Sequence, residues 1–303
     1  MQRIKLPRLL LIGLGLLVLA SSALAENWFD FRKEIELNKP LELEIEVTRG
    51  EIVLVGGNDN RLIIEAVKRI RGKDWDKSRR IADKIEINVD RFGDAIRLST
   101  EYLPLDGDDR SFFEKIFGRH ANAYGDVDFH ITLPVTSRIK INAVSARVEL
   151  SSVTARVDIE NGFGSVRCEY LDGPITVRQK EGPIDLQWIE GDIRIKAELG
   201  RIWIKQTQGA LDLSTEKGNV SVQTELNSPR DYFIETKSGT IEFMVPERSA
   251  GYLSIETHSG EIATKVPISI ESASRTKLAG AFGAGGPRIE ISSVSGDVMV
   301  AGF

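Results

Sequence analysis

The chain has 303 residues, with 40 lysines and arginines, 45 aspartates and glutamates, and a formal net charge of −5. Removing the three basic residues of the predicted leader leaves 37 basic residues against 45 acidic ones, a charge of −8. This acidic balance argues against nucleic acid or an anionic membrane surface as a partner. The single cysteine, Cys168, excludes an internal disulfide, and its place in the pattern predicts a buried thiol.

Residues 1–25 have the pattern of a signal peptide. Arg3, Lys5 and Arg8 precede an apolar run over residues 9–20, and Ala23-Leu24-Ala25 has the small-x-small form of a cleavage site. We therefore expect an exported protein that begins at Glu26 and lies in the periplasm, at the cell surface or outside the cell. The alternative is an uncleaved anchor, although the run is short for a span of about 20 residues. After cleavage we expect no transmembrane span.

Residues 26–126 predict a β-rich capping region. Apolar residues alternate over 41–47, 52–55 and 62–67, which indicates strands, and residues 56–60 form a turn. Residues 74–84 break the alternation and suit a short amphipathic helix. Strands resume over 85–89 and 95–98. We expect this region to cover the first coil of the repeat domain that follows it.

Residues 102–126 are the least regular stretch. On a helix, Phe112, Phe113, Ile116 and Phe117 would share one face. We interpret the stretch as an excursion whose aromatic residues dock on the side of the solenoid. The alternative is an apolar tab in which Phe112, Phe113 and Phe117 contact a partner or a membrane.

Residues 127–303 predict a repeat domain. A small residue recurs every nine positions, as alanine at 146 and 155 and then as glycine from 164 to 218. Apolar residues stand two and four positions after each of them, which indicates a short strand with one buried face. Nine residues are too few to circle a core, so one coil must hold two or three repeats. The sequence therefore predicts an all-β fold, a solenoid with short rungs.

The outward residues favour two repeats per coil. Stacking every third repeat would align Asp158, Asp185 and Asp212, and like charges directly opposite are destabilising. Stacking every second repeat gives columns of alternating charge, one of which is Glu149-Arg167-Asp185-Trp203-Ser221. It also makes Tyr170 and Trp188 neighbours. We expect an 18-residue, two-sided coil; an antiparallel meander with the same buried pattern is the alternative.

The rungs lengthen after Gly218. An Ile-x-Thr-x-Ser-Gly-x-Ile pattern at residues 234–241 returns 21 residues later at 255–262, and a third version closes the chain at 291–298. We expect the same rungs here with longer corners, in coils of about 21 residues. The glycine- and alanine-rich stretch 279–287 predicts a flexible corner loop.

The Ser-Gly-x-[Ile/Val] rungs at Ser238, Ser259 and Ser295, together with the Gly-Gly-Pro-Arg-Ile run that starts at Gly285, resemble a known family. It is the "putative adhesin" domain-of-unknown-function family of bacterial envelope β-repeat proteins. The resemblance covers roughly residues 41–303 and is strongest from residue 144 onward. It implies a β-solenoid-like domain exported to the cell envelope, and no catalytic residues belong to the family pattern.

No cofactor or metal is expected. His120, His130 and His258 have no metal-ligand spacing among them, and no nucleophile elbow or phosphate-binding loop is present. The nine-residue rhythm is similar to that of calcium-binding β-rolls, but residues 161–165 lack the aspartate of that motif.

Two main classes of function fit a repeat surface. The one we favour is a non-catalytic, adhesin-like envelope scaffold or binding module that contacts an unknown envelope polymer or protein. The other is a polysaccharide-active β-helix enzyme, in which Arg167 and Asp185 would stand beside Trp203 as a platform for a sugar. A self-assembling structural protein of the envelope is a third interpretation. Arg167, Asp185 and Trp203 are the candidate surface contacts in the repeats.

Overall fold

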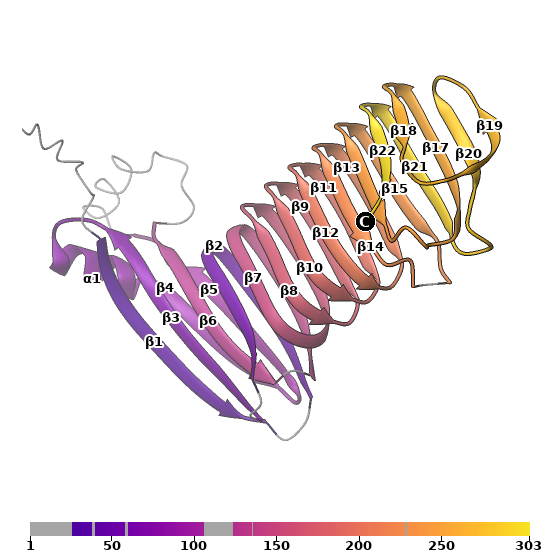
Figure 1. Ribbon diagram of the computed structural model, residues 1–303. Helices are drawn as coiled ribbons and strands as arrows, with labels where there is room; N and C mark the ends of the chain where they lie inside the picture. The colour runs from indigo at the N-terminus through magenta and orange to yellow at the C-terminus, as the bar shows by residue number, and fades with distance from the viewer. Residues whose placement is uncertain (1–25, 38–39, 58–59, 106–123, 135, 228) are drawn as a thin grey trace, which may run out of the picture.

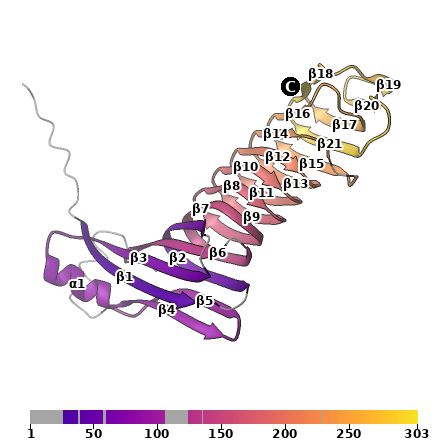
Figure 2. The same cartoon turned by 60° about the horizontal axis from the view of Figure 1, so that its bottom comes forward.

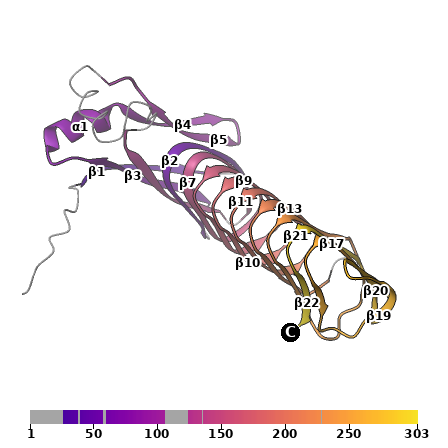
Figure 3. The ribbon, with the colours of Figure 1, turned by 90° about the horizontal axis from the view of Figure 1, so that it is seen from above.

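The computed structural model of the protein describes residues 26–37, 40–57, 60–105, 124–134, 136–227 and 229–303. These residues form an elongated β-solenoid whose N-terminal end widens into two separate sheets (Figure 1). Seen from two further directions, the coils make one continuous stack (Figures 2 and 3). The predicted fold class, an all-β solenoid with a β-rich N-terminal part and one short helix, is confirmed. The predicted signal peptide lies outside the described residues.

Strands on alternate sides build the coils. They are β7 (Thr136–Phe163), β8 (Val166–Asp172), β9 (Ile175–Glu181), β10 (Ile184–Glu190), β11 (Ile193–Leu199), β12 (Ile202–Gln208), β13 (Leu211–Lys217), β14 (Val220–Thr224), β15 (Tyr232–Ser238) and β16 (Ile241–Val245). Ile184 of β10 lies opposite Val166 of β8 and Ile202 of β12, in parallel ladders. The 18-residue, two-sided coil is thus confirmed, and the parallel pairing rules out the meander. From β13 onward the coil has 21 residues, as Leu211 lies opposite Tyr232.

The core lies between two faces, which we call the β10 face (β8, β10, β12, β14 and β16) and the β11 face (β9, β11, β13 and β15). All eighteen apolar positions of the nine-residue pattern, from Val148 to Val222, are at most 2% exposed. Each such side chain contributes about 1.5–3 kcal/mol by leaving water. The repeated rungs therefore share one unbroken core along the axis of the solenoid.

At the corners, the backbone of one coil lies in direct contact with the backbone of the next coil. Gly200 has a φ of +142°, and a Cβ atom there would lie 2.0 Å from the carbonyl oxygen of Gly182, one coil below. Only glycine permits this approach, which explains the glycine at every corner of the central coils.

Amide side chains inside the solenoid bind the corner carbonyl groups. Asn161 Nδ2 donates to the oxygen of Ala146 at 2.9 Å, and Gln206 Nε2 donates to the oxygen of Gly191 at 2.8 Å. These buried polar residues were not predicted from the sequence. They stand six positions after a small residue, so their spacing was visible in the sequence.

The C-terminal coils are stacked out of chain order. They comprise β17 (Gly251–Ser259), β18 (Ile262–Thr264), β19 (Ser269–Ala273), β20 (Lys277–Phe282), β21 (Arg288–Ser295) and β22 (Val298–Gly302). β21 pairs with β15 on one side and β17 on the other, while β22 lies between β16 and β18. The coil of β21 and β22, which comes last in the sequence, therefore lies between the coil of β15 and β16 and the coil of β17 and β18. The copies at 234–241 and 255–262 are thus separated in the stack by the third copy at 291–298.

The predicted corner loop 279–287 is partly wrong. Residues up to Phe282 belong to β20, which pairs antiparallel with both β17 and β19. Gly280 permits this pairing, because a Cβ there would lie 2.4 Å from the oxygen of Ser269. Gly280 thus serves a close strand approach, whereas residues 283–287 form an irregular corner in which Gly283, Gly285 and Gly286 have positive φ.

At the other end, β2 (Leu41–Gly57) forms a whole coil by itself. Both of its halves pair with β7, while the first half also pairs with β5 (Ala95–Tyr102) and the second with β6 (Asp126–Pro134). Beyond β2 the sheets part. β3 (Arg61–Arg71) and then β1 (Glu26–Glu36) extend the β10 face, and β4 (Ile85–Phe92) extends the β11 face. The expected boundary at residues 126 and 127 thus falls at the start of β6, and β2 on its N-terminal side already belongs to the stack.

The predicted helix is α1 (Trp75–Asp83), at the wide end of the molecule (Figure 1). The Asp74 side chain accepts from the Lys77 backbone N–H at 3.0 Å, which caps the first turn. Ile81 and Ala82 are buried, and the helix contacts β1, β3 and β4. No strand was predicted over residues 26–36, although Phe29, Phe31 and Ile35 alternate there and pack on the core. Among the described residues, no helix is long and apolar enough to cross a membrane.

Candidate functional site

Arg167, Asp185 and Trp203 form one column on the β10 face, as predicted. Arg167 of β8 lies opposite Asp185 of β10, and Asp185 lies opposite Trp203 of β12. Glu149 and Ser221 extend the column at its two ends. We call the three central residues the Arg167 column. Because each strand is hydrogen-bonded on both sides, the spacing of these side chains is fixed by the backbone at about 4.8 Å per coil.

The side-chain contacts of Arg167 and Asp185 run along their own strands rather than between strands. The Arg167 guanidinium pairs with Glu169 on its own strand, and the hydrogen bond and charge of Glu169 raise the pKa of Arg167. Gln187 Nε2 donates to Asp185 Oδ1 at 3.0 Å. On the β11 face the pairing crosses strands instead, since Arg194 Nε lies 3.0 Å from Asp212 Oδ2. The charges of Arg167 and Asp185 are therefore held in place but remain at the surface.

An aromatic stack stands beside the column. The rings of Tyr170 and Trp188 are parallel within 1°, with centroids 6.4 Å apart, and Lys205 Nζ lies 3.6 Å from the centroid of Trp188. The sequence predicted that the two rings are neighbours, and the stack confirms it. Tyr170 is 59% exposed and Trp188 is 41% exposed. We call Tyr170, Trp188 and Lys205 the aromatic ladder.

A backbone bulge turns these rings outward. Tyr170 and Trp188 have φ values of +56° and +57°, in the left-handed region that bulky residues rarely adopt. The next residues, Leu171 and Ile189, fill the core instead. At β12 the register shifts, and Gln206 becomes the partner of Ile189. Positive φ at two large residues costs free energy, and such strain is often found at functional positions.

The other candidate residues differ from expectation or lie outside the described ranges. Trp203 points outward but is only half-exposed, because its neighbours on β10 and β14 stand in register beside it. Phe112, Phe113 and Phe117 lie outside the described residues. Cys168 is buried as predicted, and burial raises the pKa of its thiol to about 12. Among the described residues, no three His, Cys, Asp or Glu side chains converge to hold a metal ion.

Comparison with known proteins shows that the second half of the stack is similar to a family model. Residues 192–301 match the family model described as Toastrack DUF4097. The match confirms, for this segment, the resemblance to a domain-of-unknown-function family of β-repeat proteins. It covers the coils from β11 to β22, including the inserted last coil. No curated protein matches the chain.

Solved structures are similar to the chain at low identity. A "putative adhesin" from Bacteroides fragilis is 11% identical, covers 91% of this chain and 97% of its own, and has a TM-score of 0.34. A "putative cell adhesion protein" from Clostridium sporogenes is 10% identical, with coverages of 91% and 100% and a TM-score of 0.27. A "putative lipid binding protein" from Parabacteroides distasonis is 10% identical, with coverages of 90% and 96% and a TM-score of 0.33. Similarity at these scores carries no functional argument.

Proposed function

We propose that the protein is an exported, non-catalytic envelope protein that uses its β10 face as an adhesin-like binding scaffold. The observation that carries the proposal is the aromatic ladder beside the Arg167 column. Three consecutive strands of one face present two exposed aromatic rings, a half-exposed tryptophan and fixed charges within a single surface. Aromatic and arginine side chains dominate the free energy of protein recognition when they are held in place.

The rigidity of the solenoid supports this role. Neighbours on both sides hydrogen-bond every strand of the patch, so a partner meets a surface that needs no ordering on binding. Extended repeat surfaces of this kind are commonly used for contact with large partners. The partner we propose is a polymer or a protein of the envelope, and the acidic balance of the chain argues against nucleic acid.

Export is part of the same proposal. It is supported by the basic residues, apolar run and Ala23-Leu24-Ala25 site at the start of the sequence. Sequencing the N-terminus of the protein recovered from the envelope or the medium tests it. We expect Glu26 as the first residue, and an intact Met1 would contradict export with cleavage.

A pull-down from solubilised envelope tests the binding role. We expect the wild-type protein to retain a defined partner, and we expect Trp188→Ala and Trp203→Ala to reduce retention more than Arg167→Ala does, because aromatic anchors contribute most. Arg194→Ala is the matched control, because Arg194 is also an outward-facing arginine paired with a carboxylate, but it lies on the β11 face. Equal retention by all four variants and wild type would contradict a role for the β10 face.

A further inference from the structure

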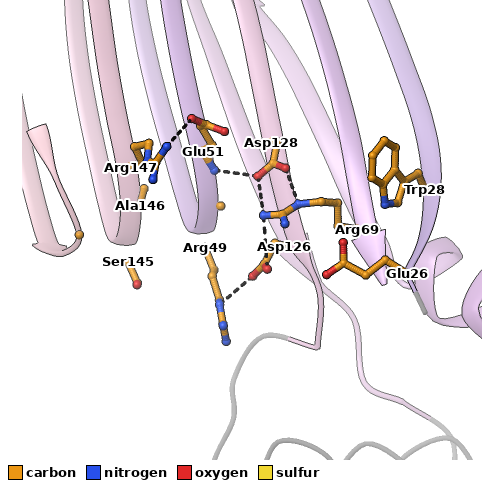
Figure 4. A pocket seen from close by; sticks show the side chains of 12 residues that line it. Glu26, Trp28, Arg49, Glu51, Arg69, Asp126, Asp128, Ser145, Ala146 and Arg147 are labelled. Atoms are coloured by element: carbon orange, nitrogen blue, oxygen red, sulfur yellow. Dashed lines mark hydrogen bonds and ion pairs between the residues drawn. The ribbon is translucent and has the colours of Figure 1, made fainter. Parts of the chain in front are cut away.

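A hollow opens where the two sheets part, at the corner between β2 and β7 (Figure 4). Its volume is about 550 Å³, and we call it the junction hollow. Apart from Gly164, the residues that line it come from β1, β3, β6, β2 and β7, which are consecutive neighbours in the sheet. It lies apart from the aromatic ladder, which begins one coil further along the stack.

One cross-strand row of side chains runs through the junction hollow. Trp28 lies opposite Arg69, and Arg69 lies opposite Asp126. Asp126 Oδ1 lies 2.7 Å from Arg49 Nε in an ion pair, and Arg49 lies opposite Ser145. The row therefore presents an aromatic ring, a cation, an anion, a cation and a hydroxyl in sequence. At about 4.8 Å per strand it extends over about 19 Å.

The polar part of the row is fixed in place. Arg69 Nε lies 2.5 Å from Asp128 Oδ2, and the Glu51 backbone N–H donates to Asp128 Oδ1 at 2.9 Å. Burial opposes the charge on Arg69, but its hydrogen bond to Asp128 and the charges of Asp128 and Asp126 outweigh burial and raise its pKa. The side chains of Asp126 and Asp128 are only 14% and 23% exposed. The ion pairs and hydrogen bonds therefore hold these planar groups in place around the hollow without a ligand (Figure 4).

Trp28 differs from its neighbours in the row. It stands on the outward side of β1 and is 66% exposed, although it is among the largest apolar side chains of the molecule. An exposed indole beside fixed carboxylate and guanidinium groups offers an apolar plane and several directed hydrogen-bond partners together. This combination matches a pyranose ring, which has an apolar C–H face and hydroxyl groups around its edge.

We propose that the junction hollow binds an uncharged oligosaccharide, with Trp28 stacking on one sugar ring and Arg69, Asp126 and Arg49 bonding to the hydroxyl groups of the units that follow. A β-linked sugar unit advances a glycan by about one strand spacing, so the row accommodates about four units. Three arginines and four carboxylates line the hollow, a net charge of −1, which does not favour a strongly anionic polymer.

A peptide fits the hollow less well. β3, β6 and β2 are each paired on both sides, so a peptide strand could add only at the outer edge of β1, away from the charged side chains of the hollow. Apart from Trp28, the large side chains that line the hollow are charged, so it also lacks an apolar pocket for a peptide anchor.

Calorimetric titration of the mature protein with cellotetraose, chitotetraose, maltotetraose and mannotetraose tests the proposal. We expect at least one of the four to bind, and we expect Trp28→Ala to weaken that binding at least tenfold while Trp28→Phe, which keeps a ring, weakens it less. Phe92→Ala is the matched control, because Phe92 is 68% exposed on β4, in the other layer. Melting curves of the variants check that each is folded.

Three results would overturn the proposal: no binding of any of the four tetrasaccharides, equal binding by wild type and Trp28→Ala, or binding only of a polyuronate tetramer added as a charged comparison. The site is also distinguishable from the β10 face. Trp188→Ala should leave tetrasaccharide binding unchanged, whatever its effect on the envelope partner, and loss of tetrasaccharide binding in this variant would contradict a site at the junction.

Discussion

The corner glycines should be the positions of the repeat least tolerant of a single methyl group. In Gly200→Ala the new Cβ would lie 2.0 Å from the oxygen of Gly182, at a φ of +142°. The backbone conformation costs about 1–3 kcal/mol for a residue with a side chain, and the steric overlap adds about 1–3 kcal/mol. We therefore expect a loss of about 4 kcal/mol in the free energy of unfolding.

Gly93 offers a matched control. It also has a positive φ, +66°, but a Cβ there meets no atom within 4 Å. Gly93→Ala should therefore carry only the backbone cost, about 1–2 kcal/mol. A loss of 1 kcal/mol lowers the melting temperature of a chain of this size by about 2–4 °C. Melting curves recorded by circular dichroism should therefore show a fall of about 12 °C for Gly200→Ala and about 4 °C for Gly93→Ala. Equal shifts for the two variants would refute the argument that backbone contact between coils, rather than local conformation, requires glycine at the corners.

Further predictions concern the core, the thiol and the inserted coil. Ile202→Asp places an unpaired charge at a position that is 1% exposed and should cost several kcal/mol, so a wild-type urea midpoint for this variant would show that the core is wrongly assigned. The pKa of the Cys168 thiol is about 12 in the folded protein, against 9.0 for a free thiol. Because only the unfolded state loses this proton just above pH 9, the free energy of unfolding should fall by about 1.4 kcal/mol per pH unit there. Cys168→Val should lack this part of the pH dependence in urea titrations, and identical pH profiles would contradict it. Ending the chain at residue 287 removes β21 and β22, which join β17 and β18 to the stack. The amides of residues 251–264 should then lose their protection from hydrogen exchange, while those of β8 to β12 keep theirs. Unchanged protection of β17 would mean that other contacts hold it in place.

The sequence specified the coil well because its signal is local and repeated. Apolar residues two and four positions after each small residue define the buried face, and the charges of the outward residues decide between stacking every second and every third repeat. The Arg167 column and the neighbouring rings of Tyr170 and Trp188 follow directly from that choice.

Other features depend on contacts that no short pattern encodes. The three Ser-Gly rungs are alike in sequence, so the pattern does not encode the order β15, β21, β17 in which they stack. The row in the junction hollow combines Trp28, Arg49, Arg69, Asp126 and Ser145 from five strands, and only long-range pairing makes them neighbours. The outward bulge at Tyr170 was visible only indirectly, in the apolar Leu171 that follows it.

The central claim is that the protein binds an envelope component without altering it chemically. The most direct measurement incubates the mature protein with isolated envelope, sediments the mixture, and analyses both the bound protein and the released fragments. We predict that wild type sediments with the envelope, that Trp188→Ala stays largely in the supernatant, and that neither protein releases fragments. Release of glycan or peptide fragments by wild type, abolished in Asp185→Ala, would contradict the account and indicate an enzyme.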